Sequence, residues 1–340
     1  MKFLLYFIVI FFSIFADSKV ITCPIFEASD TGCQNINAHG GGIYYFNHEY
    51  YWVGESFPSK GEKGDKHFYS VSLYKSNDLS HWYDMGEVLK ANYKSGDLQL
   101  GSTIERPKIV YDKNKEKYYI YFHLELKGEG YNSARVGVAV SDNVTGPYRF
   151  LSSFRLNKGF MPIGEDSLNS LKHPTFFKRD INSGHDSRDL NIFQDNDGKY
   201  YLVTSSENNT SIYISELNKD LTGLTGRYAR LFPGMGNEAP ILFKMNNLYY
   251  MVTSDVSGWK PNRARLFMSN SIFENWVFLG DFVKSNSLDV SNTFSSQGSY
   301  IFKYRNDFYF LADRWNTSDL KLSSYLVKKI YWDGNRPYIK

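Results

Sequence analysis

A hairpin pattern that recurs five times constrains the fold of this 340-residue chain more than any other feature. The clearest copy is NEAPILFKMNNLYYMVTS at residues 237–254. A polar residue precedes an apolar strand, a short Asn-rich turn reverses the chain, and an aromatic strand returns, which is the pattern of a β-hairpin. The polar residues that begin the copies, called the leading residues below, are His39, Glu105, Asp189, Glu238 and Gln297. In chain order they precede the first residue of the aromatic pair by 11, 13, 11, 11 and 11 positions.

The second half of the repeat also recurs. Segments 74–82, 140–148, 214–221 and 268–276 each have the pattern of a strand, a polar turn and another strand. Repeating all-strand units of this size are typical of a β-propeller. We therefore predict an all-β fold, a five-bladed β-propeller with four strands per blade, formed by residues 19–340 as one domain. Because the first strand of each blade lines the axis, the leading residues should form a ring at one mouth.

Residues 1–18 differ from the rest of the chain. Lys2 is followed by a mostly apolar run at residues 3–15 and then by a short polar segment. The run is too short for a comfortable membrane span, so we interpret residues 1–18 as a secretory signal peptide. The alternative is an uncleaved anchor. This interpretation predicts a secreted, extracellular protein.

The cysteine content fits the same compartment. Cys23 and Cys33 are the only cysteines of the chain, and in an oxidising environment they are expected to form a disulfide bond. Two free thiols are the alternative, whereas a structural zinc site lacks further ligands at suitable spacing. Glycosylation sequons begin at Asn143, Asn208, Asn209 and Asn316 and fit a secreted glycoprotein, although sequons also arise by chance in Asn-rich chains.

The charge pattern excludes some classes of partner. The formal net charge is +3, and residues of both signs are interspersed. Such a balance does not predict a basic patch of the kind that binds nucleic acid or an anionic membrane. We expect a monomer that binds neither after signal cleavage.

Three of the five leading residues are carboxylates. Neighbouring like charges raise at least one pKa, so the ring should supply a proton donor beside a carboxylate that stays charged. Glycoside hydrolases use such a pair of carboxyl groups to cleave the glycosidic bond. Ordinary turn residues are the structural alternative. A calcium site is less favoured because its ligands usually come from one loop, so no metal and no cofactor are expected.

Five motifs resemble those of glycoside hydrolase family 43, and more narrowly its galactan 1,3-β-galactosidase (exo-β-1,3-galactanase) branch. They are INAHGGG at 36–42, ERPK at 105–108, SRDL at 187–190, NEAP at 237–240 and SGWKPN at 257–262. The resemblance extends over about residues 35–320, in order and with blade spacing. It implies a five-bladed propeller of inverting enzymes, which agrees with the repeat count.

The resemblance also implies catalytic roles. It makes Glu238 the general acid, Asp189 the carboxylate that tunes and orients that acid, and Glu105 a contact of the terminal sugar needed for activity. The first blade lacks the Asp base of most of the family, and Gln297 matches a Gln thought to hold the nucleophilic water in the galactanase branch. A neutral Gln could equally indicate an inactive sugar-binding protein. His39 is a possible substitute base, but we favour a structural or substrate-contacting role.

Several further residues are candidate substrate contacts. Glu55, Tyr131 and Ser257 match galactose-contacting positions of the branch, and Asn208 matches less securely. Trp315, Trp259 and Tyr131 lie outside the repeated aromatic pairs and could stack on sugars. Residues 154–187 are long and polar, and could either border the pocket or be surface.

These observations predict a secreted inverting glycoside hydrolase. We expect it to release galactose from the non-reducing end of β-1,3-galactan, the backbone of arabinogalactan. The alternatives are another family 43 activity, such as an arabinofuranosidase or xylosidase, and a non-catalytic galactan-binding propeller. The missing first-blade Asp argues against the first alternative, and the presence of the acid with its tuning carboxylate argues against the second.

Overall fold

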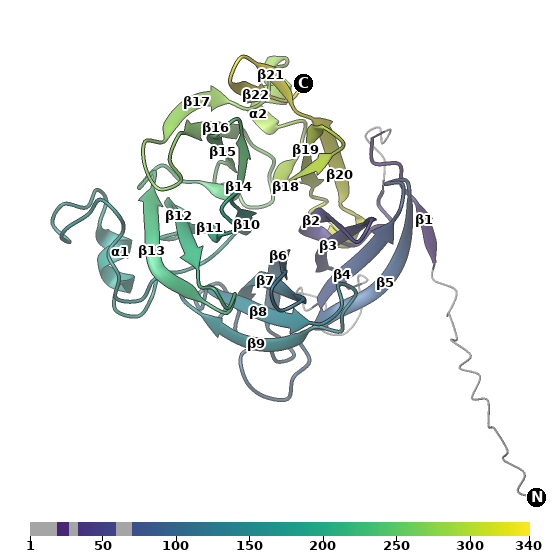
Figure 1. The fold of residues 1–340 in the computed structure, drawn as a ribbon, viewed down its shortest axis with the longest axis horizontal. Coiled ribbons are helices and arrows are strands. Elements are labelled where there is room, and N and C mark those ends of the chain that lie inside the picture. The colour runs from purple at the N-terminus through teal and green to yellow at the C-terminus, as the bar shows by residue number, and fades with distance from the viewer. Residues whose placement is uncertain (1–18, 27–32, 59–69) are drawn as a thin grey trace, which may run out of the picture.

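The computed structural model describes residues 19–26, 33–58 and 70–340. Five antiparallel sheets surround a central axis as the blades of a propeller, so the predicted fold is confirmed (Figure 1). The innermost strands are β2, β6, β10, β14 and β18, and three of them, β2, β14 and β18, begin at a leading residue. The proposed signal peptide lies outside the described residues. Among the residues that are described, no helix has the length and apolar character needed to span a membrane.

The strands follow one another outward within each blade. Blade one contains β2 (His39–Phe46), β3 (Glu49–Ser56), β4 (Ser70–Ser76) and β5 (His81–Lys90), with β1 (Val20–Thr22) outside β5. Blade two contains β6 (Thr103–Asp112), β7 (Lys117–Glu125), β8 (Arg135–Ser141) and β9 (Arg149–Phe154). Blade three contains β10 (Leu190–Gln194), β11 (Tyr200–Ser206), β12 (Ser211–Leu217) and β13 (Leu224–Leu231). Blade four contains β14 (Glu238–Met245), β15 (Leu248–Ser254), β16 (Ala264–Ser269) and β17 (Val277–Asp281). Blade five contains β18 (Gln297–Tyr304), β19 (Asp307–Arg314) and β20 (Ser324–Lys329).

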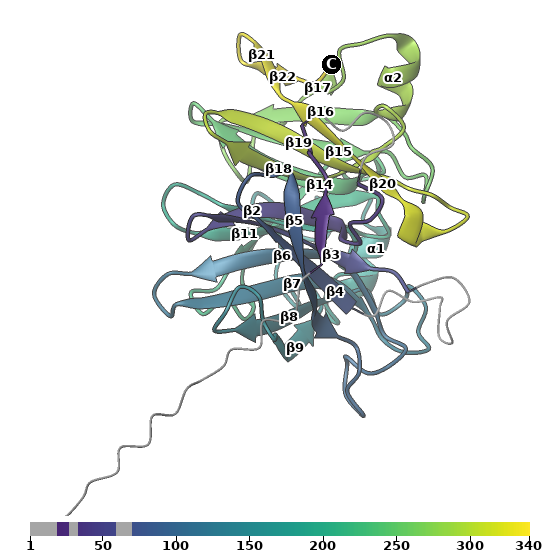
Figure 2. The same cartoon turned by 90° about the vertical axis from the view of Figure 1, so that its right-hand side faces the viewer.

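The prediction of four strands per blade therefore holds for the middle blades and not for the two terminal ones. Within the described part of the chain, blade one has a fifth strand because β1 pairs with β5, as Figure 2 also shows from the side. Blade five has three. A separate hairpin of β21 (Tyr331–Asp333) and β22 (Arg336–Tyr338) follows it, and Trp332 of this hairpin packs on Phe243 and Tyr250 of blade four.

Aromatic and aliphatic side chains fill the space between neighbouring blades. Each of the five hydrophobic clusters combines strands of two adjacent blades. The ring closes where blade five meets blade one, because the Tyr325 hydroxyl donates to the Ile36 carbonyl oxygen at 2.8 Å and accepts from the Ala38 amide at 3.0 Å. The repeated aromatic pairs thus serve mainly to hold blade to blade.

A β-bulge follows the leading residue in several innermost strands. Register shifts occur between His39 and Gly42, between Glu105 and Lys108, and between Glu238 and Ile241. The residue directly after each leading residue has a positive φ: 58° at Gly40, 53° at Arg106 and 49° at Ala239. A bulge bends the strand and redirects its side chains. The repeat therefore changes the direction of the chain at the mouth of the propeller.

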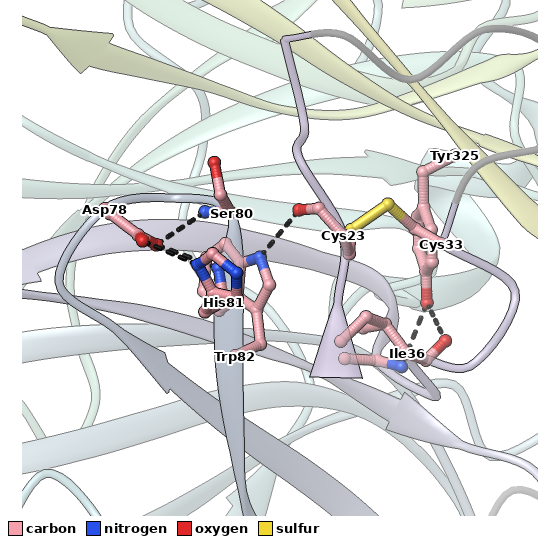
Figure 3. The surroundings of a disulfide bond; sticks show 9 residues. Cys23, Cys33, Ile36, Asp78, Ser80, His81, Trp82 and Tyr325 are labelled. Atoms are coloured by element: carbon pink, nitrogen blue, oxygen red, sulfur yellow. Dashed lines mark hydrogen bonds and ion pairs between the residues drawn. A yellow bond between two sulfur atoms is a disulfide. The ribbon is translucent and has the colours of Figure 1, made fainter. Parts of the chain in front are cut away.

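The predicted disulfide bond is confirmed. Cys23 and Cys33 are bonded, with their Cα atoms 5.1 Å apart. Cys23 directly follows β1, and its carbonyl oxygen accepts a hydrogen bond from the Trp82 indole at 3.1 Å (Figure 3). The bond thus ties the N-terminal segment to blade one.

Helices are few and short in the described residues. They are α1 (Thr175–Asp180), α2 (Ser287–Asn292) and the 3-10 helix η1 (Leu320–Leu322). Helix α1 belongs to the long polar segment 154–187, which lies at the outside of blades two and three (Figure 1). An isolated bridge between Leu156 and His185 draws the ends of this segment together.

Candidate active site

A cavity of about 280 Å³ lies at the mouth of the propeller and is lined by residues of all five blades. The lining residues are Glu55 from blade one; Glu105, Arg106, His123 and Tyr131 from blade two; Arg188, Asp189 and Asn209 from blade three; Glu238, Gly258 and Trp259 from blade four; and Gln297 and Trp315 from blade five. Four of the five leading residues are among them. Four of the five residues that the repeat was expected to bring together at the mouth therefore meet there.

His39 does not complete the ring, because it does not line the cavity. Its side chain has no exposed surface. The ring is stacked on Tyr325, with centroids 5.0 Å apart, and its Nδ1 lies 3.3 Å from Asp313 Oδ1. Asp313 also accepts a hydrogen bond from the Gly40 amide at 3.1 Å. His39 therefore joins blades one and five behind the cavity, and this packing favours the structural role over that of a base or a sugar contact.

Glu238 has the properties of a proton donor. Burial, and then the charge of Asp189, raise the pKa of Glu238 to about 8, although Arg106, the Ser257 amide and Arg188 act in the opposite direction. The Asn209 side-chain amide donates to Glu238 Oε1 at 2.8 Å. At neutral pH most Glu238 carries its proton.

Asp189 is held beside Glu238 by the backbone. The amide of Ala239, the residue next to Glu238, donates to Asp189 Oδ2 at 2.9 Å. The Arg106 Nε donates to Asp189 Oδ1 at 3.1 Å. Both carboxylate oxygens thus accept hydrogen bonds, one from each donor. The site combines a protonated carboxylic acid with a charged carboxylate.

Arg106 connects the catalytic candidates of three blades. Besides Asp189, its guanidinium donates to Gln297 Oε1 at 2.6 Å and to the Gly298 carbonyl oxygen at 3.1 Å. Its own backbone amide donates to Glu55 Oε2 at 2.6 Å. Beneath it, the buried Lys108 donates to the Gly40 carbonyl oxygen at 2.6 Å. The planar fork of an arginine suits such divergent contacts.

The orientation of the Gln297 side chain follows from its neighbours. Arg106 and the Trp315 indole, at 2.6 and 3.1 Å, are groups that can only donate, so the atom facing them must be the amide oxygen Oε1. The amide nitrogen Nε2 then donates to Ser254 Oγ at 3.2 Å. One N–H of the Nε2 amide group remains for a molecule in the cavity.

Glu105 and Glu55 form a second acidic pair on the opposite blades. Glu105 accepts hydrogen bonds from the Tyr131 hydroxyl at 2.5 Å and from His123 Nδ1 at 2.9 Å. Burial, followed by the charge of Glu105, raises the pKa of Glu55 well above its usual range, with Arg106 opposing both. The pair thus offers hydrogen-bond acceptors of different charge to a polyhydroxylated ligand.

Aromatic rings enclose part of the cavity, as expected for sugar binding. Trp259 and Trp315 are packed edge to face, with centroids 4.8 Å apart. Trp315 also lies over the Arg106 guanidinium at 5.9 Å. Tyr131 lines the wall formed by blade two. The three aromatic residues that fell outside the repeat therefore meet at one site.

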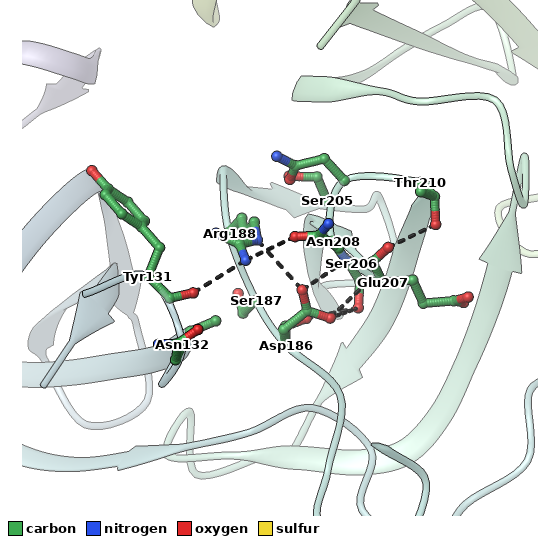
Figure 4. Close-up of polar contacts among 12 residues, drawn as sticks. Tyr131, Asn132, Asp186, Ser187, Arg188, Ser205, Ser206, Glu207, Asn208 and Thr210 are labelled. Carbon is green, nitrogen blue, oxygen red and sulfur yellow. Dashed lines mark hydrogen bonds and ion pairs between the residues drawn. The ribbon is translucent and has the colours of Figure 1, made fainter. Parts of the chain in front are cut away.

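Asn208 and Ser257 are not among the residues that line this cavity, and their predicted substrate contacts stay predictions. Asn208 is exposed and accepts a hydrogen bond from Arg188 at 3.1 Å, as Figure 4 shows. Its neighbour Asn209 is the one that reaches Glu238. The Ser257 hydroxyl is bonded within its own loop, to the Lys260 carbonyl oxygen at 2.6 Å.

Four polar residues that line the cavity were not selected from the sequence: Arg106, His123, Arg188 and Asn209. Arg106 and Asn209 each stand next to a residue that was selected. His123 carried a signal that could have been used, because it lies on the same face of its strand as Glu125 and the neighbouring strand contains Glu105. Among the described residues, no group of three or more His, Cys, Asp or Glu side chains could hold a metal ion.

Comparison with known families gives one match. The profile of glycosyl hydrolases family 43 matches residues 171–278. A β-D-galactofuranosidase of Aspergillus niger is 28% identical over 153 residues, which are 44% of this chain and 36% of that relative. The chain thus matches about a third of that protein's length.

Solved structures are similar over nearly the whole chain. A family 43 β-1,3-galactosidase, BT3683, with galactodeoxynojirimycin, has 38% identity and a TM-score of 0.84 over 90% of this chain and 94% of its own. An exo-β-1,3-galactanase of Clostridium thermocellum has 29% identity and a TM-score of 0.76 over 94% of this chain and 65% of its own. An exo-β-1,3-galactanase from Phanerochaete chrysosporium, with β-1,3-galactotriose, has 27% identity and a TM-score of 0.76 over 95% of this chain and 67% of its own.

Proposed function

The chain belongs to glycoside hydrolase family 43, and from this premise we propose that it releases galactose from the non-reducing end of β-1,3-galactan. The structures most similar to it that are named above are β-1,3-galactosidases and exo-β-1,3-galactanases. The proposed substrate is therefore the β-1,3-galactan backbone of arabinogalactan, and the proposed reaction is inverting hydrolysis.

Glu238 is the proposed general acid. The observation that carries the proposal is its pKa of about 8 beside Asp189, whose two oxygens accept bonds from Arg106 and Ala239. A carboxylic acid that is protonated near neutral pH can donate its proton to the oxygen of the departing sugar. Asp189 keeps that acid protonated and, through the Ala239 amide, fixes the strand that carries it.

Gln297 is the proposed holder of the attacking water. Arg106 and Trp315 donate to the amide oxygen of Gln297, so the water accepts a hydrogen bond from the remaining N–H of Nε2. The water oxygen bonds to the anomeric carbon as the bond to the departing oxygen breaks and Glu238 protonates that oxygen. An amide does not accept a proton near pH 7, so the proton that the attacking water loses as the new bond forms passes to solvent water. In this proposal Gln297 orients the water and does not deprotonate it.

The remaining cavity residues would hold the terminal galactose. Glu105 and Glu55 supply acceptors for sugar hydroxyl groups, and Tyr131 fixes one oxygen of Glu105. Trp315 and Trp259 supply apolar surface for the sugar's carbon face. Hydrogen bonds of this kind with ionised groups are about twice as strong as neutral ones.

We also propose that the protein is secreted and acts as a monomer. The apolar run at residues 3–15 supports export. The Cys23–Cys33 bond supports an oxidising compartment. Asn209 is a poor glycosylation acceptor because its side-chain amide is bonded to Glu238.

Galactose release from β-1,3-galactan by the purified chain tests the function. Wild type should release galactose, and Glu238→Gln should lose about 10²- to 10⁴-fold in rate, the usual contribution of general acid catalysis. Gln297→Ala should also lose most activity. Glu129→Gln and Gln194→Ala are matched controls at exposed positions and should retain full rate. Galactan binding without release by wild type would contradict the proposal.

A further inference from the structure

A buried carboxylate lies just outside the cavity, next to the side that Glu105, His123 and Tyr131 line. This side of the cavity is called the sugar-binding edge below. Glu125 is only 2% exposed and does not line the cavity. His123 lies between Glu125 and Glu105: its Nε2 is 2.8 Å from Glu125 Oε1, and its Nδ1 is 2.9 Å from Glu105 Oε2. Because His123 and Glu125 are two residues apart on β7, their side chains share one face of the strand. Cross-strand pairing places Glu105 directly opposite His123.

The same carboxylate also holds the loop that carries Tyr131. Glu125 Oε2 accepts hydrogen bonds from Ser133 Oγ at 2.6 Å and from the Ala134 amide at 2.9 Å. These residues follow Tyr131 by two and three positions, and the Tyr131 hydroxyl donates to Glu105 Oε1 at 2.5 Å. Glu105 is therefore held from two sides, by His123 and by Tyr131, and both supports depend on Glu125.

We propose that Glu125 is a positioning residue for the sugar-binding edge of the active site. Through His123 it fixes the rotamer and charge of Glu105, and through the loop backbone it fixes Tyr131. This inference rests on the proposed function in one respect, namely that Glu105 and Tyr131 hold the terminal sugar. The arrangement of the three side chains is independent of the substrate.

The charge state of His123 makes this arrangement testable. Ionised carboxylates can only accept, so an imidazole between two of them must donate from both nitrogens and carry a positive charge. Burial acts against that charge, but the hydrogen bonds to Glu105 and Glu125 outweigh it and raise the pKa of His123 to about 9. The titratable groups that face His123 are Glu105 from β6, Glu125 from β7 and Tyr131 from the loop, with Glu55 behind Glu105.

Removal of the Glu125 charge should therefore release the proton from His123. In Glu125→Gln, we expect the His123 titration, followed by NMR of histidine-labelled protein, to move down from about pH 9 by at least one pH unit. Glu105 then loses its charged donor near neutral pH. On a β-1,3-galactan oligosaccharide, KM should rise about tenfold or more, with a smaller change in kcat, and the alkaline limb of kcat/KM should shift to lower pH.

Two further variants separate the charge from the loop contact. Ser133→Ala removes the hydrogen bond to Glu125, together with the one that Ser133 Oγ accepts from the Leu126 amide, and leaves the carboxylate. KM should therefore rise while the His123 titration stays in place. Glu129→Gln makes the same substitution at an exposed position of the same loop and should change neither quantity. His123→Gln identifies the His123 signal by its loss.

The outcomes distinguish this inference from the proposed function. A wild-type His123 that titrates near pH 6.5, or an unchanged titration in Glu125→Gln, overturns the inference whatever the activity. A wild type without galactanase activity, but with the expected His123 titration, overturns the function and retains the positioning. If Glu125→Gln does not fold, the wild-type titration and Ser133→Ala still decide.

Discussion

Replacement of Asp189 by Asn tests the electrostatic basis of the proposed acid. The substitution preserves the size of the side chain and removes its negative charge, the second-largest cause of the raised pKa of Glu238. It also leaves the Arg106 guanidinium without that carboxylate, which lowers the pKa of Glu238 further. Burial, the largest cause, is unchanged. The pKa of Glu238 should therefore fall from about 8 without reaching that of an exposed Glu.

The size of the effect follows from the interaction of two charges. Like unit charges about 5 Å apart interact by about 3 kcal/mol at an effective dielectric constant of about 20. Since 1.36 kcal/mol corresponds to one pKa unit, loss of the Asp189 charge accounts for about two units. A pKa near 6 would leave about one Glu238 in ten protonated at pH 7. Activity at that pH should then fall about tenfold from this cause alone.

The assay is the pH dependence of kcat/KM on a β-1,3-galactan oligosaccharide. A general acid must be protonated, so wild-type activity should decline as pH rises through about 8. In Asp189→Asn, the decline should begin one to two pH units lower. Asp197→Asn, in the exposed turn of the same blade, should reproduce the wild-type profile. An alkaline limb that stays in place or moves up in Asp189→Asn refutes the reasoning.

Two further predictions concern other parts of the fold. Arg106→Lys replaces the guanidinium that contacts Asp189, Gln297 and Gly298 by a single ammonium group. We expect kcat/KM to fall by about 10²-fold or more, while the circular dichroism spectrum stays unchanged. Full activity would show that the guanidinium is dispensable. Cys23→Ser with Cys33→Ser opens a short loop and should lower the free energy of unfolding by about 2–3 kcal/mol in urea titrations, while kcat is retained. No loss of stability would mean that the N-terminal segment contributes little to blade one.

The repeat predicted the fold and much of the site because both depend on local pattern. An apolar strand, a turn and an aromatic strand form a hairpin wherever they occur, and five such units close into a propeller. The start of each innermost strand then lies at the mouth, which places Glu105, Asp189, Glu238 and Gln297 together. The strand count of the terminal blades was not predictable, because it depends on how β1 pairs with β5.

Side-chain direction at bulges and turns decides which of the predicted site residues line the cavity. His39 begins a blade as the other leading residues do, but its side chain packs against Asp313 behind the cavity. Asn208 and Asn209 both have positive φ, and only Asn209 turns toward Glu238. Such directions depend on backbone torsions that a sequence pattern does not specify.

The anomeric form of the first product tests the central claim most directly. Proton NMR during the early hydrolysis of a reduced β-1,3-galactan oligosaccharide resolves α- and β-galactose before they equilibrate. With Glu238 as acid and a water held by Gln297, the newly released galactose should be the α-anomer, because a single displacement inverts the β-linkage. Release of β-galactose, or of no galactose from an oligosaccharide that binds, would contradict the account.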